Sequence, residues 1–500
     1  WRSCFRLASV SSEQAMVRVG SVLNVLSVVL MIFAFAMAAP LAVSFFYGDA
    51  ALHAYDAAVL ITFTAGLALW AGTRGRRQEL KPRDGFLLVA LTWTVVPAFA
   101  TLPLIIHLPD LSFTDAYFET VSGLTTSGAT TLSGLDNLPP SINLWRTMLV
   151  WIGGMGVVVL AVAILPLLGA GGSQIMRAET PGPMKDTKLT PRITETAKGL
   201  WVVYLLITVA CILSMKAAGM TWFDAVVHAF STMGLGGFSS HDESFGYFRS
   251  PAIEAVTIFF MLVAGINFGT HFVAFRRTSF KPYRADPEAG AYLAVVILSC
   301  LGIAYFLFAN SVYPNFVTAL RHASFNVVSI ATTTGFSSTD FSQWPIFAPV
   351  WMLFLSCFAT CSGSTGGGIK MVRAELMVRQ ALREMVRIVH PRALIPIKLA
   401  GQTVENNIVF AVLAFMLVYG GTMTTMTMLL AASALDIVTA FTAIVACLNN
   451  MGPGLGQVGP ATTYAALNDF QTWICTAAML LGRLELFSLL VVFTPAFWRK

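Results

Sequence analysis

Thr125-Thr126-Ser127-Gly128 is the stretch of this sequence that decides the fold, because three related stretches follow it at intervals of about a hundred residues. These are Met233-Gly234-Leu235-Gly236, Thr332-Thr333-Thr334-Gly335 and Asn449-Asn450-Met451-Gly452. Each stretch follows a short apolar segment and precedes a long one. A fourfold repeat of polar, glycine-bearing loops in an apolar chain predicts four walls around one ion path.

The composition places these loops in a membrane protein. Of 500 residues, 56% are hydrophobic and only 11% are charged, whereas a soluble domain carries about 25% charged residues. A membrane-spanning helix needs roughly 20 apolar residues. Ten stretches qualify, the eighth of them imperfectly: 21–46, 52–72, 85–107, 143–168, 197–218, 252–275, 289–309, 346–371, 404–431 and 470–498.

The distribution of charge predicts the topology. Lys and Arg cluster in four segments, 74–83, 177–198, 276–284 and 370–398. The positive-inside rule assigns all four to the cytoplasmic side. Because membrane spans separate them, we expect lipid and no nucleic acid around them. We expect residues 1–15, which precede Met16, to be a leader outside the membrane fold, and 21–46 to be a retained anchor.

Pairs of long spans lie between the basic segments, so each pair goes out and returns. Within the last four pairs lie shorter apolar stretches, 112–124, 221–232, 315–331 and 435–448. They are too short to cross about 30 Å of hydrocarbon and suit re-entrant half-helices. Irregular backbone at membrane depth is tolerated only where it is buried in protein or lines a watery cavity. Asp115, Asp224 and Asp436 open or nearly open three of the half-helices, with Thr114 and Thr221 as candidate caps.

The sequence therefore predicts an all-α polytopic membrane protein with four parallel M1–P–M2 repeats (span, half-helix and loop, span) around one pseudo-fourfold pore. The expected boundaries are 1–80 for the leader and an accessory helix pair, 81–192 for repeat 1, 193–285 for repeat 2, 286–398 for repeat 3 and 399–500 for repeat 4. Repeat 3 would include a cytoplasmic amphipathic helix over 372–390, ended by Pro391 and Pro396.

Loops of this composition suit a dehydrated cation. Backbone carbonyls replace the water of the ion without a fixed charge, so the ion can leave again. Glycine tolerates the dihedral angles that point successive carbonyls inward. The plainer interpretation is that the glycines allow close helix contact. Four loops at regular spacing, each behind a half-helix, favour the pore.

The run Gly363-Ser364-Thr365-Gly366-Gly367-Gly368-Ile369-Lys370 follows Cys361-Ser362 and interrupts the eighth span. It is not a phosphate-binding loop, because no Gly-Lys-Ser/Thr occurs in it. Three consecutive glycines break a helix. They indicate either a simple kink or a mobile loop across the path below the filter.

Arg483 is a lone arginine in the last span, which makes it a functional candidate. Facing the conduit, it would repel cations. The alternative is a structural ion pair with an acid, for which Glu485 is poorly placed because helix neighbours two apart do not face each other.

The other motifs in the sequence give little evidence of a metal site, a disulfide framework or an enzyme. His241-Asp242-Glu243 could be mistaken for a metal site, but one His beside two acids in an outer loop predicts a vestibule surface. The seven cysteines contain no CxxC pair, so we expect neither a disulfide framework nor a zinc site. No HExxH, nucleophile elbow or dinucleotide fingerprint occurs, and we expect no enzyme and no cofactor.

The stretches 122–130, 236–242, 333–337, 363–370 and 448–454 resemble the TrkH-type subunit of the Trk/Ktr/HKT potassium uptake superfamily, from about residue 20 to the C-terminus. The resemblance implies a K+ pore in a bacterial inner membrane, with filter glycines Gly128, Gly236, Gly335 and Gly452 and further carbonyls from the residues before them. It implies a gating loop at 361–368 and a pore-constricting arginine at Arg483. It also implies a homodimer and a cytoplasmic RCK-type, nucleotide-binding partner of the TrkA class. Ser127, and Met233-Gly234, depart from the usual pattern.

Three alternatives remain. A Na+-permeable or cation-coupled relative of the same fold would carry the same repeats, although Gly128 favours K+ because plant Na+ transporters of the superfamily have serine there. A solute transporter would be expected to use inverted repeats rather than parallel ones. A membrane-embedded enzyme would need paired catalytic groups at membrane depth, and the sequence offers none.

Overall fold

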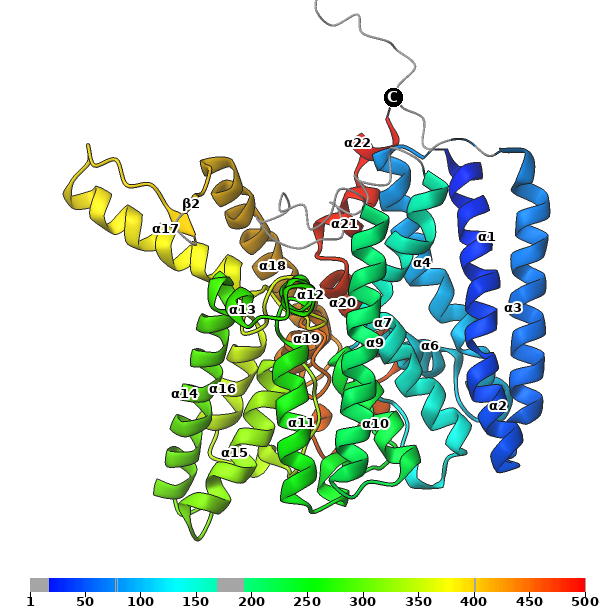
Figure 1. Ribbon diagram of the computed structural model, residues 1–500, viewed down its shortest axis with the longest axis horizontal. Coiled ribbons are helices and arrows are strands. Elements are labelled where there is room, and N and C mark those ends of the chain that lie inside the picture. The colour runs from blue at the N-terminus through cyan, green and yellow to red at the C-terminus, as the bar shows by residue number, and fades with distance from the viewer. Residues whose placement is uncertain (1–17, 77, 79, 169–192, 400–401, 500) are drawn as a thin grey trace, which may run out of the picture.

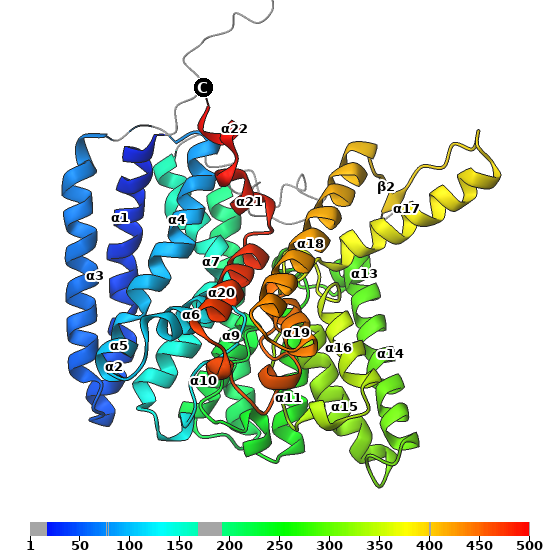
Figure 2. The ribbon, with the colours of Figure 1, turned by 180° about the vertical axis from the view of Figure 1, so that it is seen from behind.

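The structure is a computed structural model that describes residues 18–76, 78, 80–168, 193–399 and 402–499. Helices dominate it, and the described strands form one short antiparallel hairpin, β1 (Lys398–Leu399) with β2 (Gln402–Thr403). Long helices run across the molecule, and shorter ones lie between them near its middle (Figures 1 and 2). The chain is an all-α polytopic membrane protein, as its sequence predicts.

The elements follow the predicted order of an accessory pair and four repeats. The accessory pair contains α1 (Val19–Ala36), α2 (Ala38–Tyr47), α3 (Leu52–Thr73) and η1 (Arg74–Arg76). Repeat 1 contains α4 (Pro82–Ala100), α5 (Leu102–His107), α6 (Phe113–Leu124), η2 (Leu135–Asn137) and α7 (Pro140–Leu168). Repeat 2 contains α9 (Ile193–Ala217), α10 (Trp222–Gly234), η4 (Ser244–Tyr247), α11 (Pro251–Ala264), α12 (Phe268–Arg277) and α13 (Lys281–Ala285).

Repeat 3 contains α14 (Pro287–Ala309), α15 (Phe316–Ala331), η5 (Phe341–Gln343), α16 (Phe347–Ser356) and α17 (Met371–Val389), followed by the hairpin. Repeat 4 contains α18 (Asn406–Ala432), α19 (Ile437–Leu448), η6 (Gly456–Val458), η7 (Tyr464–Ala466), α20 (Asp469–Arg483), α21 (Phe487–Leu490), η8 (Val491–Phe493) and α22 (Pro495–Trp498). Helix α17 occupies the segment predicted as a cytoplasmic amphipathic helix and projects from the body of the molecule (Figure 1).

The spans agree with the apolar stretches of the sequence, with three informative exceptions. In the described residues, six helical segments are long and apolar enough to cross a membrane by themselves. Two further segments are bent, by 95° between α11 and α12 and by 105° between α20 and the turns that follow it. Helix α16 stops after 10 residues, so the predicted span 346–371 is half helix and half loop. The breaks therefore fall in the second spans of repeats 2, 3 and 4.

The four pore helices α6, α10, α15 and α19 occupy the segments predicted as half-helices. Each begins at a side chain that accepts a hydrogen bond from the backbone N–H three residues on, the usual N-cap arrangement. The four caps are Ser112, Thr221, Asn315 and Asp436. The prediction of Thr114 as a cap is wrong. Thr114 lies in the first turn of α6, because Ser112 already has the extended backbone that a cap requires.

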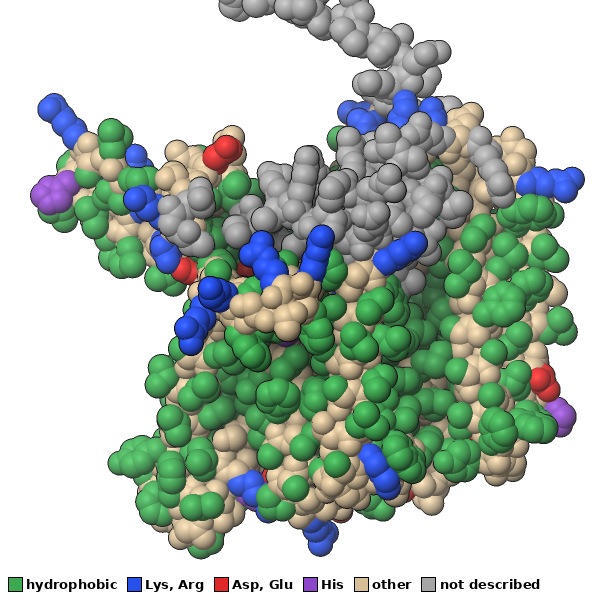
Figure 3. Space-filling view, viewed as in Figure 1, with side chains coloured by type: hydrophobic (Ala, Val, Ile, Leu, Met, Phe, Trp, Pro, Cys, Tyr) green, Lys and Arg blue, Asp and Glu red, His purple; other side chains and the backbone are tan. Residues whose placement is uncertain are grey.

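The surface separates apolar sides from a charged end. Apolar side chains cover the flanks of the long helices, and Lys and Arg gather toward the end that carries α17 and the C-terminus (Figure 3). Helices α1, α3, α9 and α14 expose large apolar side chains such as Phe35, Leu60, Val202 and Leu298. Exposed apolar flanks of this extent are expected for a chain in contact with lipid.

A candidate ion-conducting site

The four glycine loops share one backbone conformation. Each contains two residues with positive φ, separated by a single residue that is not in this region. The pairs are Thr126 (57°) and Gly128 (79°), Leu235 (55°) and Gly237 (58°), Thr333 (58°) and Gly335 (90°), and Asn450 (53°) and Gly452 (98°). Positive φ is uncommon outside glycine, so its recurrence at the same step marks one shared loop design.

This comparison changes the assignment in repeat 2. The residue before the glycine donates its N–H to the carbonyl five residues back in every loop: Ser127 to Ser122, Gly236 to Ser231, Thr334 to Ser329, and Met451 to Ala446. Gly236 is therefore the counterpart of Ser127, and Gly237 is the counterpart of Gly128. The sequence-based assignment to Gly236 is one residue too early. The order Gly-Phe-Ser, shared by 237–239 and 335–337, was a usable sequence signal for Gly237.

The loops meet in a closed ring. A methyl group on Gly128 would lie 2.4 Å from the carbonyl oxygen of Gly236, and one on Gly237 would lie 2.3 Å from that of Thr334. A methyl group on Gly335 would lie 2.1 Å from the carbonyl oxygen of Met451, and one on Gly452 would lie 2.8 Å from that of Ser127. Each loop thus abuts the next, and the fourth returns to the first. The absent side chains are required by space as well as by dihedral angle.

Side chains on the pore helices hold the chain that leaves each loop. Glu119, His228 and Asn326 all lie nine residues before their loop glycine. Glu119 accepts hydrogen bonds from the Thr130 hydroxyl at 2.9 Å and the Thr131 N–H at 3.0 Å. The other three contacts follow the same plan: His228 Nε2 to the Ser239 hydroxyl at 2.9 Å, Asn326 Nδ2 to the Ser338 hydroxyl at 3.1 Å, and the Leu455 N–H to the Thr442 hydroxyl at 2.9 Å.

Repeat 1 adds a buried ion pair to this support. The Arg146 Nε lies 2.8 Å from a Glu119 carboxylate oxygen, and both side chains are 1% exposed. Arg146 also donates to the Ser239 carbonyl of repeat 2 at 3.0 Å and lies over the Phe238 ring at 4.5 Å. The pair fixes the seam between repeats 1 and 2. The sequence pattern alone did not predict this pair, although a glutamate inside a pore helix is a usable signal.

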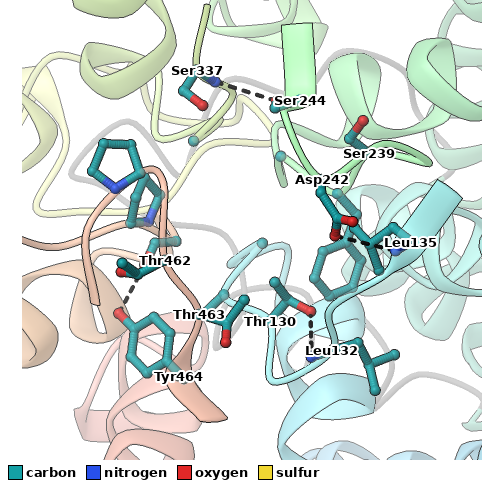
Figure 4. A pocket seen from close by; sticks show the side chains of 18 of the residues that line it. Thr130, Leu132, Leu135, Ser239, Asp242, Ser244, Ser337, Thr462, Thr463 and Tyr464 are labelled. Carbon is teal, nitrogen blue, oxygen red and sulfur yellow. Dashed lines mark hydrogen bonds between the residues drawn. The ribbon is translucent and has the colours of Figure 1, made fainter. Parts of the chain in front are cut away.

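A cavity of about 240 Å³ lies on the outer side of the ring. It is lined by the four ring glycines, Gly128, Gly237, Gly335 and Gly452, together with outer residues from all four repeats (Figure 4). His241 and Asp242 line it, so the interpretation of 241–243 as vestibule surface holds for these two residues. The described residues contain no group of three or more metal-ligating side chains.

His241 joins two repeats at this vestibule. Its Nδ1 lies 2.5 Å from a carboxylate oxygen of Asp136 in η2, and its Nε2 lies 3.2 Å from one of Asp224 in α10. The ring stacks on Tyr247 with centroids 3.6 Å apart. Burial by itself would lower the pKa of His241, but the hydrogen bonds to Asp224 and Asp136 raise it above its ordinary value.

The glycine run of repeat 3 lies directly against the inner side of the ring. The Gly367 N–H donates to the Thr333 hydroxyl at 2.8 Å, and the Thr365 hydroxyl donates to the Met233 carbonyl at 2.9 Å. A methyl group on Gly367 would lie 1.9 Å from the Asn449 carbonyl oxygen. The loop thus contacts the chain of three repeats. Lys370 is buried and donates back to the Gly366 carbonyl.

Arg483 lies at the end of α20 and contacts this loop. Its guanidinium donates to the Thr365 carbonyl at 3.0 Å and to the Gly153 carbonyl of α7 at 2.6 Å. The Glu485 carboxylate lies 2.7 Å from Arg373 at the start of α17. The helix spacing predicts that Glu485 is poorly placed to pair with Arg483. In the structure Glu485 pairs with Arg373 instead.

This geometry is that of a multi-pass membrane protein in which four glycine-bearing loops form a closed ring. The model of the TrkH family, described as cation transport protein, matches residues 52–500. The Trk system potassium uptake protein TrkH of Salmonella typhimurium is 45% identical over 481 residues, which are 96% of this chain and 99% of that protein. TrkH of Halomonas elongata is 47% identical with the same coverage.

A solved structure supports the same family assignment. The crystal structure of the potassium transporter TrkH from Vibrio parahaemolyticus superimposes with a TM-score of 0.87 at 43% identity, covering 96% of this chain and 99% of that one. The chain belongs to the TrkH family, a family of transporters rather than enzymes.

Proposed function

We propose that this chain takes up potassium across the bacterial inner membrane through a selective, channel-like pore. The observation that carries the proposal is the closed ring of four loops, each with the same pair of positive-φ residues. Loops of this kind present backbone carbonyls to a dehydrated cation without a fixed charge. The potassium uptake of the TrkH relatives supports K+ as the ion.

The proposed filter consists of the residues assigned from the sequence, except that Gly237 replaces Gly236 as the filter glycine of repeat 2. K+ is coordinated by carbonyls of 125–128, 332–335 and 449–452, and in repeat 2 by those of 234–237, with Gly237 as the filter glycine of that repeat. The loop 361–368 and Arg483 form the gate below it, because both lie against the inner side of the ring. K+ is the transported ion, and the chain itself catalyses no reaction and carries no cofactor.

The proposal includes partners. The chain works as a homodimer with a cytoplasmic, nucleotide-binding RCK-type subunit of the TrkA class that controls the gate. Helix α17 supports this part, because it projects from the molecule and exposes Val378, Leu382, Met385 and Val389 along one side. Arg373 at its base holds Glu485 beside the gate. Cross-linking of α17 in membranes tests the dimer, and co-purification tests the subunit.

The decisive test is ion uptake in cells that lack their own K+ transporters. Expression of the chain should restore growth on low K+, and Gly128→Asp or Gly335→Asp should abolish it at unchanged membrane expression. Purified protein in liposomes under opposed K+ and Na+ gradients then separates the K+ pore from a Na+-permeable relative. Normal uptake by both variants would refute the proposal.

A further inference from the structure

Tyr464 is buried inside an otherwise exposed outer segment. It lies in η7, between the fourth loop and α20, and only 2% of it is exposed, whereas Thr462 and Ala465 are exposed. Its side chain lines the cavity above the ring, next to the segment of repeat 1 that contains Thr130 (Figure 4). A buried tyrosine hydroxyl usually has a hydrogen-bond partner, and here that partner belongs to the ring of loops.

The hydroxyl of Tyr464 donates to the carbonyl oxygen of Gly452 at 2.8 Å. It also accepts a weak hydrogen bond from the Cys447 thiol of α19 at 3.9 Å. Gly452 is the fourth glycine of the ring and one of the residues that line the cavity, so this side chain binds directly to the backbone of the ring. A carbonyl oxygen has two acceptor sites, which leaves one for an ion.

The rest of Tyr464 is anchored on repeat 1. Its backbone N–H donates to the Thr130 carbonyl at 2.8 Å. Its ring packs on Phe118 of α6 with centroids 5.2 Å apart. Tyr464 therefore connects the fourth loop to repeat 1, at the place where the ring closes between repeats 4 and 1.

The other three repeats have no equivalent. The carbonyl oxygens of Gly128, Gly237 and Gly335 accept no hydrogen bond from any residue that the structure describes. The ring is fourfold in backbone conformation and asymmetric in how its glycine carbonyls are held. An oriented dipole that costs no reorganisation when the ion arrives is a better ligand than a mobile one.

We propose that Tyr464 is a specificity-determining positioning residue, which fixes the Gly452 carbonyl through its hydroxyl and so sets the size of the outermost ion site. The inference rests on the proposed potassium uptake. Without the hydroxyl, the Gly452 carbonyl can turn toward a smaller ion, and the preference for K+ over Na+ falls. The pore stays open to K+, because the remaining carbonyls are unchanged.

The test compares Tyr464→Phe with Tyr55→Phe. The control removes a hydroxyl that is equally buried and donates to the Ser141 carbonyl at 2.9 Å, but lies in α3 of the accessory pair. Each purified protein is placed in liposomes, and the reversal potential is measured with K+ on one side and Na+ on the other. We expect the K+/Na+ permeability ratio to fall roughly three- to tenfold for Tyr464→Phe, the range that one lost hydrogen bond allows, and to stay unchanged for Tyr55→Phe.

The outcomes separate the inference from the function on which it rests. If the wild-type protein shows no K+ selectivity, the proposed function fails. If the wild type is selective and Tyr464→Phe keeps the same reversal potential, the inference about Tyr464 is overturned. If Tyr464→Phe does not assemble, Phe118→Leu removes the aromatic support and keeps the hydroxyl. It should shift the potential in the same direction by less, and an unchanged potential again overturns the inference.

Discussion

The outer and inner ends of the proposed ion path are both made of glycine-rich loops, yet they are held differently. At the outer end the loops abut one another, and in the Arg146–Glu119 pair behind them each side chain is only 1% exposed. At the inner end the 361–368 loop depends on donors such as Arg483, and the adjacent Arg373–Glu485 pair is 9% and 23% exposed. Buried, mutually supporting contacts make a loop rigid, whereas partly exposed ones open locally at lower cost. The difference supports the proposed roles of the two ends, a fixed filter at the outer end and a movable gate at the inner end.

The backbone of the last span is strained where the span bends. Glu485 and Leu486 both have positive φ, 52° and 53°, although neither is glycine. They lie two and three residues after Arg483, at the place where the span bends by 105°. Residues held in this region cost of order 1–3 kcal/mol each and cluster at switch regions. Strain of this kind occurs at both ends of the proposed path, because one non-glycine residue in each ring loop also has positive φ. At the inner end it lies beside the Arg373–Glu485 ion pair at the start of α17.

The largest effect should come from breaking the outer ring itself. In Gly335→Ala the new methyl group would lie 2.1 Å from the Met451 carbonyl oxygen, at a φ of 90°. We expect K+ uptake to fall to the level of cells without the transporter. Gly134→Ala is the matched control, because Gly134 has a φ of 71° but nothing within 4 Å of the added group. Equal uptake by the two variants would show that the ring is not a filter.

The ring also shows what the sequence could and could not predict. The four pore helices were placed to within a few residues, because a short apolar run between long ones and a cap at its start are local signals. The shift from Gly236 to Gly237 was missed, because two adjacent glycines blur the register and the Gly-Phe-Ser order shared by 237–239 and 335–337 was not used. The pairing of Arg373 with Glu485 joins residues 112 positions apart, and no local pattern encodes such a contact.

The second prediction compares the two ion pairs directly. Arg146→Gln leaves the Glu119 carboxylate buried without its charge partner, which should cost about 3–5 kcal/mol of unfolding free energy. Arg373→Gln affects a partly exposed pair and should cost about 1–2 kcal/mol. Thermal unfolding of the purified variants in detergent should give the lower melting temperature for Arg146→Gln. The reverse order would contradict the distinction between a rigid outer end and a looser inner one.

The third prediction concerns the inner end alone. Arg483→Ala removes a positive charge beside the path and the donors that hold the Thr365 and Gly153 carbonyls. Single-channel K+ current should rise roughly two- to tenfold, because the electrostatic barrier to a cation falls. Arg379→Ala on α17, where the arginine side chain is 43% exposed, is the control and should leave the current unchanged. An unaltered current in Arg483→Ala would leave Arg483 a structural role only.

The smallest effect should come from the rim of the vestibule, where His241 links repeats 1 and 2. Asp136 and Asp224 contact its ring nitrogens, and the His228 ring stacks beside it with centroids 6.1 Å apart. The hydrogen bonds to the two carboxylates raise the pKa of His241 in the folded protein. Its stabilising contribution is therefore complete below about pH 6.5, the unfolded pKa of histidine, and is lost as the pH rises through the higher folded pKa.

The wild type should exceed His241→Gln in stability by at most about 1 kcal/mol at acidic pH, since the Asp136 side chain that pairs with His241 is 42% exposed to solvent. The gap should narrow as the pH rises. The same interactions lower the pKa of Asp136, so its carboxylate stays charged across this range and does not blur the comparison. Melting temperatures of both proteins from about pH 5 to about pH 9 measure the gap. A gap that widens with pH would mean that neutral His241 holds the rim, and the outer end would then owe its rigidity to packing and neutral hydrogen bonds rather than to charge.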